Sequence, residues 1–201
     1  SESLKRNITD CQKFEYGDTH DVMGHTLDYL PHFNSNHSTK IEVLNPNQAV
    51  TVTNPGNYEI VALGANSTNA KVLKIPRGDG TNLWIEYRYP IGLDSVINPD
   101  FINGMQVRVD KLGGTDTYVV DGSPGGTINS VINNPGNTKE RIDFAIGQSF
   151  VDPVSGKIIT AYTQSSDHRT LYIRVEELAA EDIIRPTVSI TSPAAWTNYF
   201  M

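Results

Sequence analysis

Between residues 48 and 175 the chain carries short runs of alternating apolar and polar side chains, and clusters of glycine and proline separate the runs. Successive side chains of a strand point to opposite faces of a sheet, so the alternation indicates strands. Glycine and proline supply the turns between them. The runs predict strands at residues 48–53, 58–63, 71–75, 83–89, 105–109, 117–120, 157–162 and 170–175. About eight such strands indicate a mainly β fold, an antiparallel sandwich or barrel, and we adopt the antiparallel β-sandwich.

One short helix is expected before the first strand. Asn34 or Ser35 can cap it, because a side-chain oxygen there accepts from a free backbone N–H. The helix runs to about Val43, and Pro46 ends it. Two apolar side chains are expected to turn inward, those of Ile41 and Leu44.

Charge and composition exclude several classes of protein. The 201 residues carry 16 basic and 23 acidic side chains, for a net charge of −7, and the basic ones form no dense cluster. Binding to nucleic acid or anionic lipid is therefore not expected, because phosphate recognition needs clustered cations. No apolar run approaches the length of a membrane helix. Residues 1–10 are polar and show no signal peptide, and Cys11, the single cysteine, has no internal disulfide partner.

The most informative stretch is residues 15–24, E-Y-G-D-T-H-D-V-M-G, in which Val22 and Met23 are apolar residues inside a polar loop. From the residues alone, such a pair is expected to plug a core. The stretch also resembles the Met-turn region of gametolysin-type metallopeptidases, a branch of the metzincins. In metzincins three histidines of H-E-x-x-H-x-x-G-x-x-H bind zinc, and the Met-turn follows. The resemblance implies that Asp21, Val22, Met23 and Gly24 form the Met-turn, with Met23 as the apolar floor beneath the metal. His20 and His25 would line the cleft.

The similarity continues in the expected order along the chain. Residues 32–63 resemble the short helix and the following strand pair of the family. Residues 84–89, W-I-E-Y-R-Y, with G-L-D at 92–94 resemble its W-x-E-Y-R…G-x-D stretch, and residues 104–109 the next strand. Residues 147–156, G-Q-S-F-V-D-P-V-S-G, resemble its G-Q-x-F-x-D-P-x-S-G turn. The resemblance covers about residues 14–176.

The zinc motif itself is absent from the sequence. No H-E-x-x-H occurs in these 201 residues, and in the family it precedes the Met-turn. A catalytic zinc needs three protein ligands and one open position. The chain is therefore expected to be the non-catalytic C-terminal portion of a zinc endopeptidase, with no catalytic or metal-binding residue of its own. Cys11 would find its partner in the missing part.

The resemblance also implies an organisation and a location. Residues 1–45 would be the remnant of the catalytic domain with the Met-turn, and residues 46–180 a β-sandwich domain. Residues 181–201 would be a linker and the first strand of an immunoglobulin-like module; an edge strand of the main domain is the alternative. The protein would be secreted or on the cell surface, of bacterial origin. Its partners would be the missing catalytic half and a protein substrate.

A different function remains open, a β-sandwich module that binds glycan or protein at a cell surface. It is motivated by aromatic side chains expected at the surface, Trp84, Tyr87 and Tyr89, because such rings stack on sugars and pack on proteins. Exposed Val22, Met23, Tyr29 and Leu30 would also favour a homo-oligomer.

Three further groups of residues are candidates for charge or metal interactions. Glu86 and Arg88 lie two apart on one strand face, so a structural ion pair is expected there in preference to a site. Loop carboxylates make calcium a candidate ligand. The carboxylates concerned are Asp94, Asp100, Asp110, Asp116 and Asp121. The histidines at 20, 25, 32 and 37 match no zinc pattern and are expected to be solvated or hydrogen-bonded.

Overall fold

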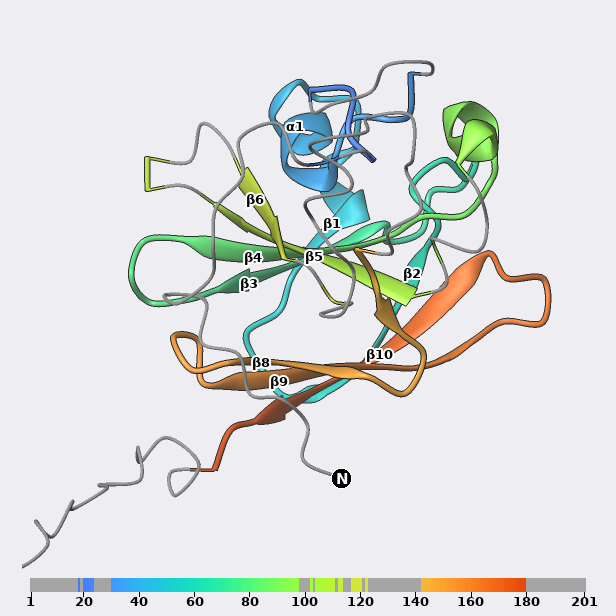
Figure 1. The fold of residues 1–201 in the computed structure, drawn as a ribbon. Helices are drawn as coiled ribbons and strands as arrows, with labels where there is room; N and C mark the ends of the chain where they lie inside the picture. Colours follow the sequence, from blue (N-terminus) through green and yellow to red (C-terminus); the bar gives the residue numbers. More distant parts are fainter. Residues whose placement is uncertain are drawn as a thin grey trace, which may run out of the picture.

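The computed structural model describes residues 18, 20–23, 30–97, 102, 104–110, 112–113, 117–120, 122 and 142–179. These residues form two β-sheets in layers, with a short helix outside the first sheet (Figure 1). The elements are α1 (Ser35–Lys40), η2 (Pro46–Gln48), β1 (Ala49–Thr51), β2 (Gly56–Val61), β3 (Val72–Pro76), β4 (Asn82–Tyr87), η3 (Gly92–Val96), β5 (Gly104–Asp110), β6 (Thr117–Val120), β7 (Phe144–Ala145), β8 (Ser149–Asp152), β9 (Lys157–Gln164) and β10 (Thr170–Glu177). The predicted sandwich-like, mainly β fold is confirmed. No helix among these residues is long and apolar enough to span a bilayer.

The two sheets are built mainly from strands that follow one another in sequence, and β2 with β10 is the pair that joins the most distant segments. The first has the order β1-β3-β4-β5-β6, with β7 also paired to β5, and the second has the order β2-β10-β9-β8. All described pairs are antiparallel except β1 and β3, which run parallel with Ala49 opposite Val72. This parallel edge departs from the predicted antiparallel arrangement. In the second sheet Val61 of β2 lies opposite Thr170 of β10.

One apolar core fills the space between the sheets. The first sheet contributes Leu73, Ile75, Leu83, Ile85, Tyr87, Met105, Val107 and Val109, and the second contributes Ile60, Phe150, Ile159, Ala161, Leu171, Ile173 and Val175. These positions follow the predicted alternation, because only every second residue of a strand faces the other sheet. Burying each large aliphatic or aromatic side chain is worth about 1.5–3 kcal/mol, which makes this core the main source of stability.

The first sheet is buried on its outer face as well, which the sequence did not predict. Trp84 and Glu86 of β4 are 5% and 0% exposed although they point away from the core. The cover is α1 and the chain before it, which lie over this face in Figure 1. Trp84, expected at the surface, is therefore buried under this cover. Tyr87, also expected at the surface, is buried in the core between the sheets, and Tyr89 is half-buried against that core.

The helix begins where the sequence predicts and ends earlier. Asn34 is its N-cap, and Asn34 Oδ1 accepts from the backbone N–H of His37 at 2.9 Å. The last helical residue is Lys40, and the chain reverses at Glu42 with φ of 59°. Ile41, expected to face inward, lies past the last turn and is 52% exposed, so that prediction is wrong; Leu44 is buried as predicted.

The eight predicted strands are all present, and two short ones were missed. β7 has only two residues, too few to show alternation, and β8 lies within the stretch interpreted as a turn at residues 147–156. The predicted module at residues 181–201, together with Cys11, Gly24 and His25, lies outside the described residues. The division at residue 45 stays a prediction.

A close contact between β5 and β7 gives a test of the fold. A Cβ added at Gly104 would lie 1.8 Å from the backbone oxygen of Phe144, whereas one added at Gly56 of β2 would meet nothing closer than 3.6 Å. We expect Gly104→Ala to lower the free energy of unfolding by about 3 kcal/mol, because backbone cannot yield cheaply. Gly56→Ala should change it by less than about 0.5 kcal/mol. Urea unfolding of both variants measures the difference, and equal effects would contradict the β5–β7 pairing.

Candidate functional site

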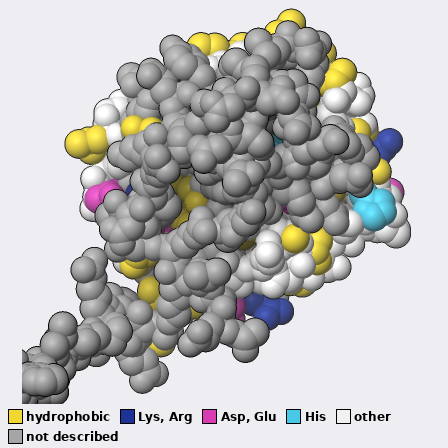
Figure 2. Space-filling view, in the orientation of Figure 1, with side chains coloured by type: hydrophobic (Ala, Val, Ile, Leu, Met, Phe, Trp, Pro, Cys, Tyr) yellow, Lys and Arg dark blue, Asp and Glu magenta, His cyan; other side chains and the backbone are white. Residues whose placement is uncertain are grey.

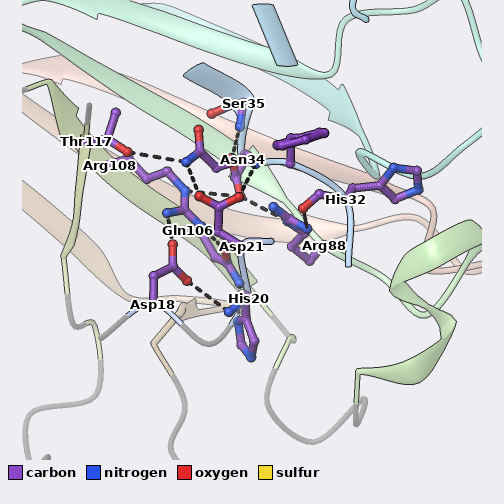
Figure 3. Close-up of polar contacts among 12 residues, drawn as sticks. Asp18, His20, Asp21, His32, Asn34, Ser35, Arg88, Gln106, Arg108 and Thr117 are labelled. Atoms are coloured by element: carbon purple, nitrogen blue, oxygen red, sulfur yellow. Dashed lines mark hydrogen bonds and ion pairs between the residues drawn. The ribbon is translucent and has the colours of Figure 1, made fainter. Parts of the chain in front are cut away.

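A layer of buried polar side chains lies between the first sheet and the N-terminal segment (Figure 3). We call it the polar layer, and its members are Asp18, His20, Asp21, Asn34, Glu86, Arg88, Asp94, Gln106 and Arg108. Strand alternation places Glu86, Gln106 and Arg108 on the outer face, and the register sets Glu86 opposite Gln106. These three side chains are at most 1% exposed. The polar layer is therefore the contact between β4, β5 and the segment that carries the proposed Met-turn.

Glu86 is the central carboxylate of the polar layer. Its Oε1 accepts from Arg88 Nε at 3.0 Å and lies 3.3 Å from Arg108 Nε, and its Oε2 accepts from the backbone N–H of Ser35 at 2.6 Å. Burial raises the pKa of Glu86, but the charges of Arg108 and Arg88 and the Ser35 N–H outweigh this and lower the pKa to about 2. The predicted structural ion pair between Glu86 and Arg88 is confirmed.

Arg88 extends the polar layer toward η3. Its Nη1 donates to Asp94 Oδ1 and to the carbonyl oxygen of His32, each at 3.0 Å. Asp94 Oδ1 also accepts from the backbone N–H of His32 at 2.9 Å. The pKa of Arg88 is raised, because Glu86 and Asp94 outweigh its burial. Arg88 thus ties the chain before α1 to the far end of the sheet.

The two described carboxylates of the proposed calcium group are engaged in the fold. Asp94 pairs with Arg88, and Asp110 accepts from Trp84 Nε1 at 2.6 Å and from the side-chain amides of Asn36 and Asn82 at 2.7 Å. Residues 100, 116 and 121 lie outside the described part, and calcium there stays a prediction. Within the described ranges no group of three His, Cys, Asp or Glu side chains could hold a metal ion.

The turn at residues 20–23 is held by hydrogen bonds just before it and within it, and it presents its methionine outward. Before the turn, Arg108 Nη1 donates to Asp18 Oδ2. Within it, Asp21 accepts from the Asn34 backbone N–H at 3.1 Å and from Asn34 Nδ2 at 2.6 Å. Val22 is half-buried, whereas Met23 is 60% exposed. The alternative that Met23 plugs a core is therefore wrong.

Asp21 is also paired with a histidine of α1. His37 Nδ1 lies 3.4 Å from Asp21 Oδ2. Burial raises the pKa of Asp21, but the hydrogen bond to His37, the charge of Arg108 and the Asn34 N–H outweigh it and lower the pKa to about 2. The carboxylate therefore stays ionised at neutral pH and fixes one end of the turn.

His20, the first residue of the turn, has a buried side chain that points toward the sheet. It is 1% exposed, and its Nδ1 lies 2.8 Å from Gln106 Nε2. Burial lowers the pKa of His20 to about 4, with the carboxylates of Asp18 and Glu86 raising it and the two arginines lowering it. His20 faces β5, and His25, the other residue expected to line the cleft, lies outside the described residues.

The described histidines do not converge on one point. His20 contacts Gln106, His32 Nε2 accepts from the backbone N–H of Leu93 at 3.3 Å, and His37 pairs with Asp21. The prediction of hydrogen-bonded histidines is confirmed for these three. Sequence reasoning missed Gln106 and Arg108. Their signal was an arginine and a glutamine alternating with core residues in β5, opposite a strand that carries Glu86 and Arg88 on the same face.

Apolar side chains are exposed on the same side of the molecule. Figure 2 shows hydrophobic side chains along the upper rim, next to α1 and η3. Leu30 is 68% exposed, and Leu93 and Val96 of η3 are 57% and 53% exposed.

No known family matches this chain, and no characterised protein or solved structure gives a match.

The central carboxylate can be tested by a neutral replacement. Glu86→Gln leaves Arg88 and Arg108 buried without their shared counter-charge. We expect it to lower the free energy of unfolding by about 3–5 kcal/mol, because removing one partner from a buried group of ion pairs is costly. Glu59→Gln, on the exposed face of β2, is the matched control and should cost less than about 0.5 kcal/mol. A loss at Glu86 as small as the control's would show that the polar layer is solvated.

The lowered pKa of Glu86 also predicts that the free energy of unfolding falls in acid. A carboxyl group whose pKa falls from 4.5 to about 2 on folding stabilises the protein above pH 4.5. This stabilisation, about 3 kcal/mol, is lost as the pH falls through that window, because the unfolded state then binds more protons. Urea unfolding between pH 5 and pH 2 should show a smaller pH dependence for Glu86→Gln than for the wild type. Parallel curves for the two proteins would refute the assignment.

Proposed function

We propose that this chain is the non-catalytic C-terminal portion of a secreted, gametolysin-type zinc endopeptidase, in which Asp21, Val22, Met23 and Gly24 form the Met-turn. The observation that carries the proposal is the exposed side chain of Met23 in a turn whose neighbours are buried and hydrogen-bonded. An apolar side chain gains about 1.5–3 kcal/mol when it is covered. A turn that is fixed in place and offers such a side chain outward suits a role as a floor for another part of the protein.

The polar layer supports this role by fixing where the turn lies. Asp18 is bound to Arg108 and Asp21 to Asn34, so the residues before Val22 and Met23 are held to β5 and to the N-cap of α1. Directional hydrogen bonds of ionised groups set position more strictly than apolar contacts do. In the proposed enzyme the β-sandwich would therefore act as the support of the Met-turn.

The described residues do not fit a zinc ion themselves, since they contain no group of three suitable ligands. The proposal places the three histidines and the glutamate in sequence before Ser1. Zinc held there would lower the pKa of its bound water for attack on a peptide carbonyl. This chain would contribute an apolar side chain beneath the metal and a rigid attachment for it.

The alternative, a module that binds glycan or protein at a cell surface, has lost two of the three aromatic residues that motivated it, while Tyr89 is half-buried. Trp84 and Tyr87 are 5% and 1% exposed and are buried on opposite faces of β4. Their rings cannot stack on a ligand at the surface.

The proposal is tested by the gene and by activity. The coding sequence immediately upstream of Ser1 is expected to encode H-E-x-x-H-x-x-G-x-x-H. The protein that includes it should hydrolyse casein, and a zinc chelator should abolish the activity, while the 201-residue chain alone should be inactive. A reading frame without the motif would eliminate the proposal.

A variant tests the role of the turn within that longer protein. Met23→Ser should lower zinc affinity or kcat/KM by about tenfold or more, as expected when a group supporting a metal site is lost. Val154→Ser is the matched control, because Val154 is an exposed apolar residue of the turn between β8 and β9. If both variants retain wild-type activity, Met23 does not support the metal.

A further inference from the structure

The contact between His20 and Gln106 allows only one protonation state of the imidazole. Gln106 has one amide oxygen, and Arg108 Nη2 lies 3.4 Å from it as a donor. A guanidinium group has no acceptor, so the oxygen of Gln106 must face Arg108 and its NH2 group must face His20. The Nδ1 atom of His20, at 2.8 Å from Gln106 Nε2, therefore accepts, and the proton of the neutral ring is on Nε2.

Protonation of His20 cannot be accommodated by rotating the amide. With both ring nitrogens protonated, Nδ1–H would face the N–H groups of Gln106. Turning the amide by 180° would relieve this contact but would set its NH2 group against Arg108. One oxygen cannot serve two donors on opposite sides in this geometry, so either arrangement leaves buried donors facing each other.

Among the described residues around His20, each carboxylate that could serve the imidazolium is already paired with an arginine. The described charged groups that act on it are Asp18 from its own segment, Glu86 from β4, Arg88 directly after β4, and Arg108 from β5. Asp18 is already paired with Arg108, and Glu86 lies between Arg88 and Arg108. With 1% exposure, the ring has almost no contact with water. A charged His20 is therefore stabilised only by leaving this position.

The described residues of the segment that carries His20 are attached to β5 by side-chain contacts, whereas β5 itself is held by backbone pairing on both sides. Gln106 and Arg108 belong to β5, which is hydrogen-bonded to β4, β6 and β7 and buried on both faces. Residues 20–23 are a turn on the outside of that sheet, and the side chains of Asp18 and His20 are the links to β5 seen among the described residues of this segment. Asp21 is bound to Asn34 and not to β5. Release of Asp18 and His20 from β5 would therefore leave the Asp21–Asn34 hydrogen bonds in place.

We propose that His20 is a protonation switch for the turn: the neutral ring accepts from Gln106 and holds Asp18 and His20 on β5, and the protonated ring releases them to solvent. The switch rests on the contacts of this chain and does not require the proposed peptidase function. If that function holds, acid would withdraw support from the Met-turn.

The expected pH window follows from the pKa of about 4 for His20 in the closed state and the usual 6.5 in the open state. The open state binds the proton more tightly, so opening becomes more favourable as the pH falls from about 6.5 to about 4. Between pH 7 and pH 5 the opening equilibrium should rise roughly 20-fold. The carboxylates of Glu86 and Asp21 stay ionised over this range, because their pKa values are about 2.

The test uses hydrogen exchange and NMR of the 201-residue chain. Exchange of peptides covering residues 18–23, corrected for the intrinsic pH dependence, should accelerate roughly 20-fold from pH 7 to pH 5, while β9 and β10 remain protected. Nitrogen-15 spectra of the histidine rings should show His20 protonated on Nε2 at pH 7. Simultaneous loss of protection in β9 and β10, unchanged exchange at 18–23, or a proton on Nδ1 would each overturn the proposal.

Two variants separate the switch from a merely structural role. His20→Asn keeps an acceptor toward Gln106 without a titrating group, so the pH dependence of exchange at 18–23 should disappear. Gln106→Glu offers a carboxylate that accepts from both Arg108 and protonated His20; it should raise the His20 titration midpoint by more than one pH unit and keep the turn attached at pH 5. The second variant, together with the wild-type ring spectra, decides the matter if the first does not fold.

The chain also contains a matched control. His168 makes the same kind of contact, with Gln164 Nε2 at 2.6 Å from its Nδ1, but at an exposed position between β9 and β10. His168→Asn should leave the exchange of residues 18–23 and its pH dependence unchanged. If His168→Asn abolished that dependence and His20→Asn did not, His20 would not be the switch.

Discussion

The sharing of Glu86 between two buried arginines governs how the N-terminal segment and the sheet fit together. Removing several charges from water is costly, and the cost is offset only where each charge has partners in good geometry. Arg88 and Arg108 obtain theirs partly from Asp94 and Asp18, which lie outside the sheet strands. The outer face of β4 and β5 therefore requires a cover that carries carboxylates in defined places. A purely apolar or solvated cover would leave the guanidinium groups unpaired.

The two faces of the first sheet do different work. Its inner face contributes apolar area, which is not directional and accounts for most of the stability. Its outer face contributes ion pairs and hydrogen bonds, which define a single placement for α1 and for the turn before it. Ser35 shows how the helix is tied to the sheet: the backbone N–H of this first helical residue donates to Glu86 of β4. The position of Met23 thus follows from the charges on two strands.

The sequence predicts the strands well because alternation depends on the geometry of one strand and its nearest layer. It predicts a cap at Asn34 or Ser35 for the same local reason, and the structure has it at Asn34. It does not reveal that Glu86, Arg88, Gln106 and Arg108 are buried, because polar residues on one face normally indicate solvent. Their burial depends on a segment far away in sequence, and so does the partner of each charge. The exposure of Ile41 was missed because the helix stops at Lys40, where the chain reverses.

The pairing of β2 with β10 has a consequence for the order of assembly. β2 enters the second sheet near the start of the sandwich, yet its hydrogen-bonding neighbour is the last described strand. Contacts between such distant segments form late, since a long loop must close before they contribute. We expect the first sheet to form with its apolar inner face uncovered until synthesis has passed residue 177. During that interval the growing chain would depend on chaperones, or on rapid completion of synthesis, to avoid aggregation.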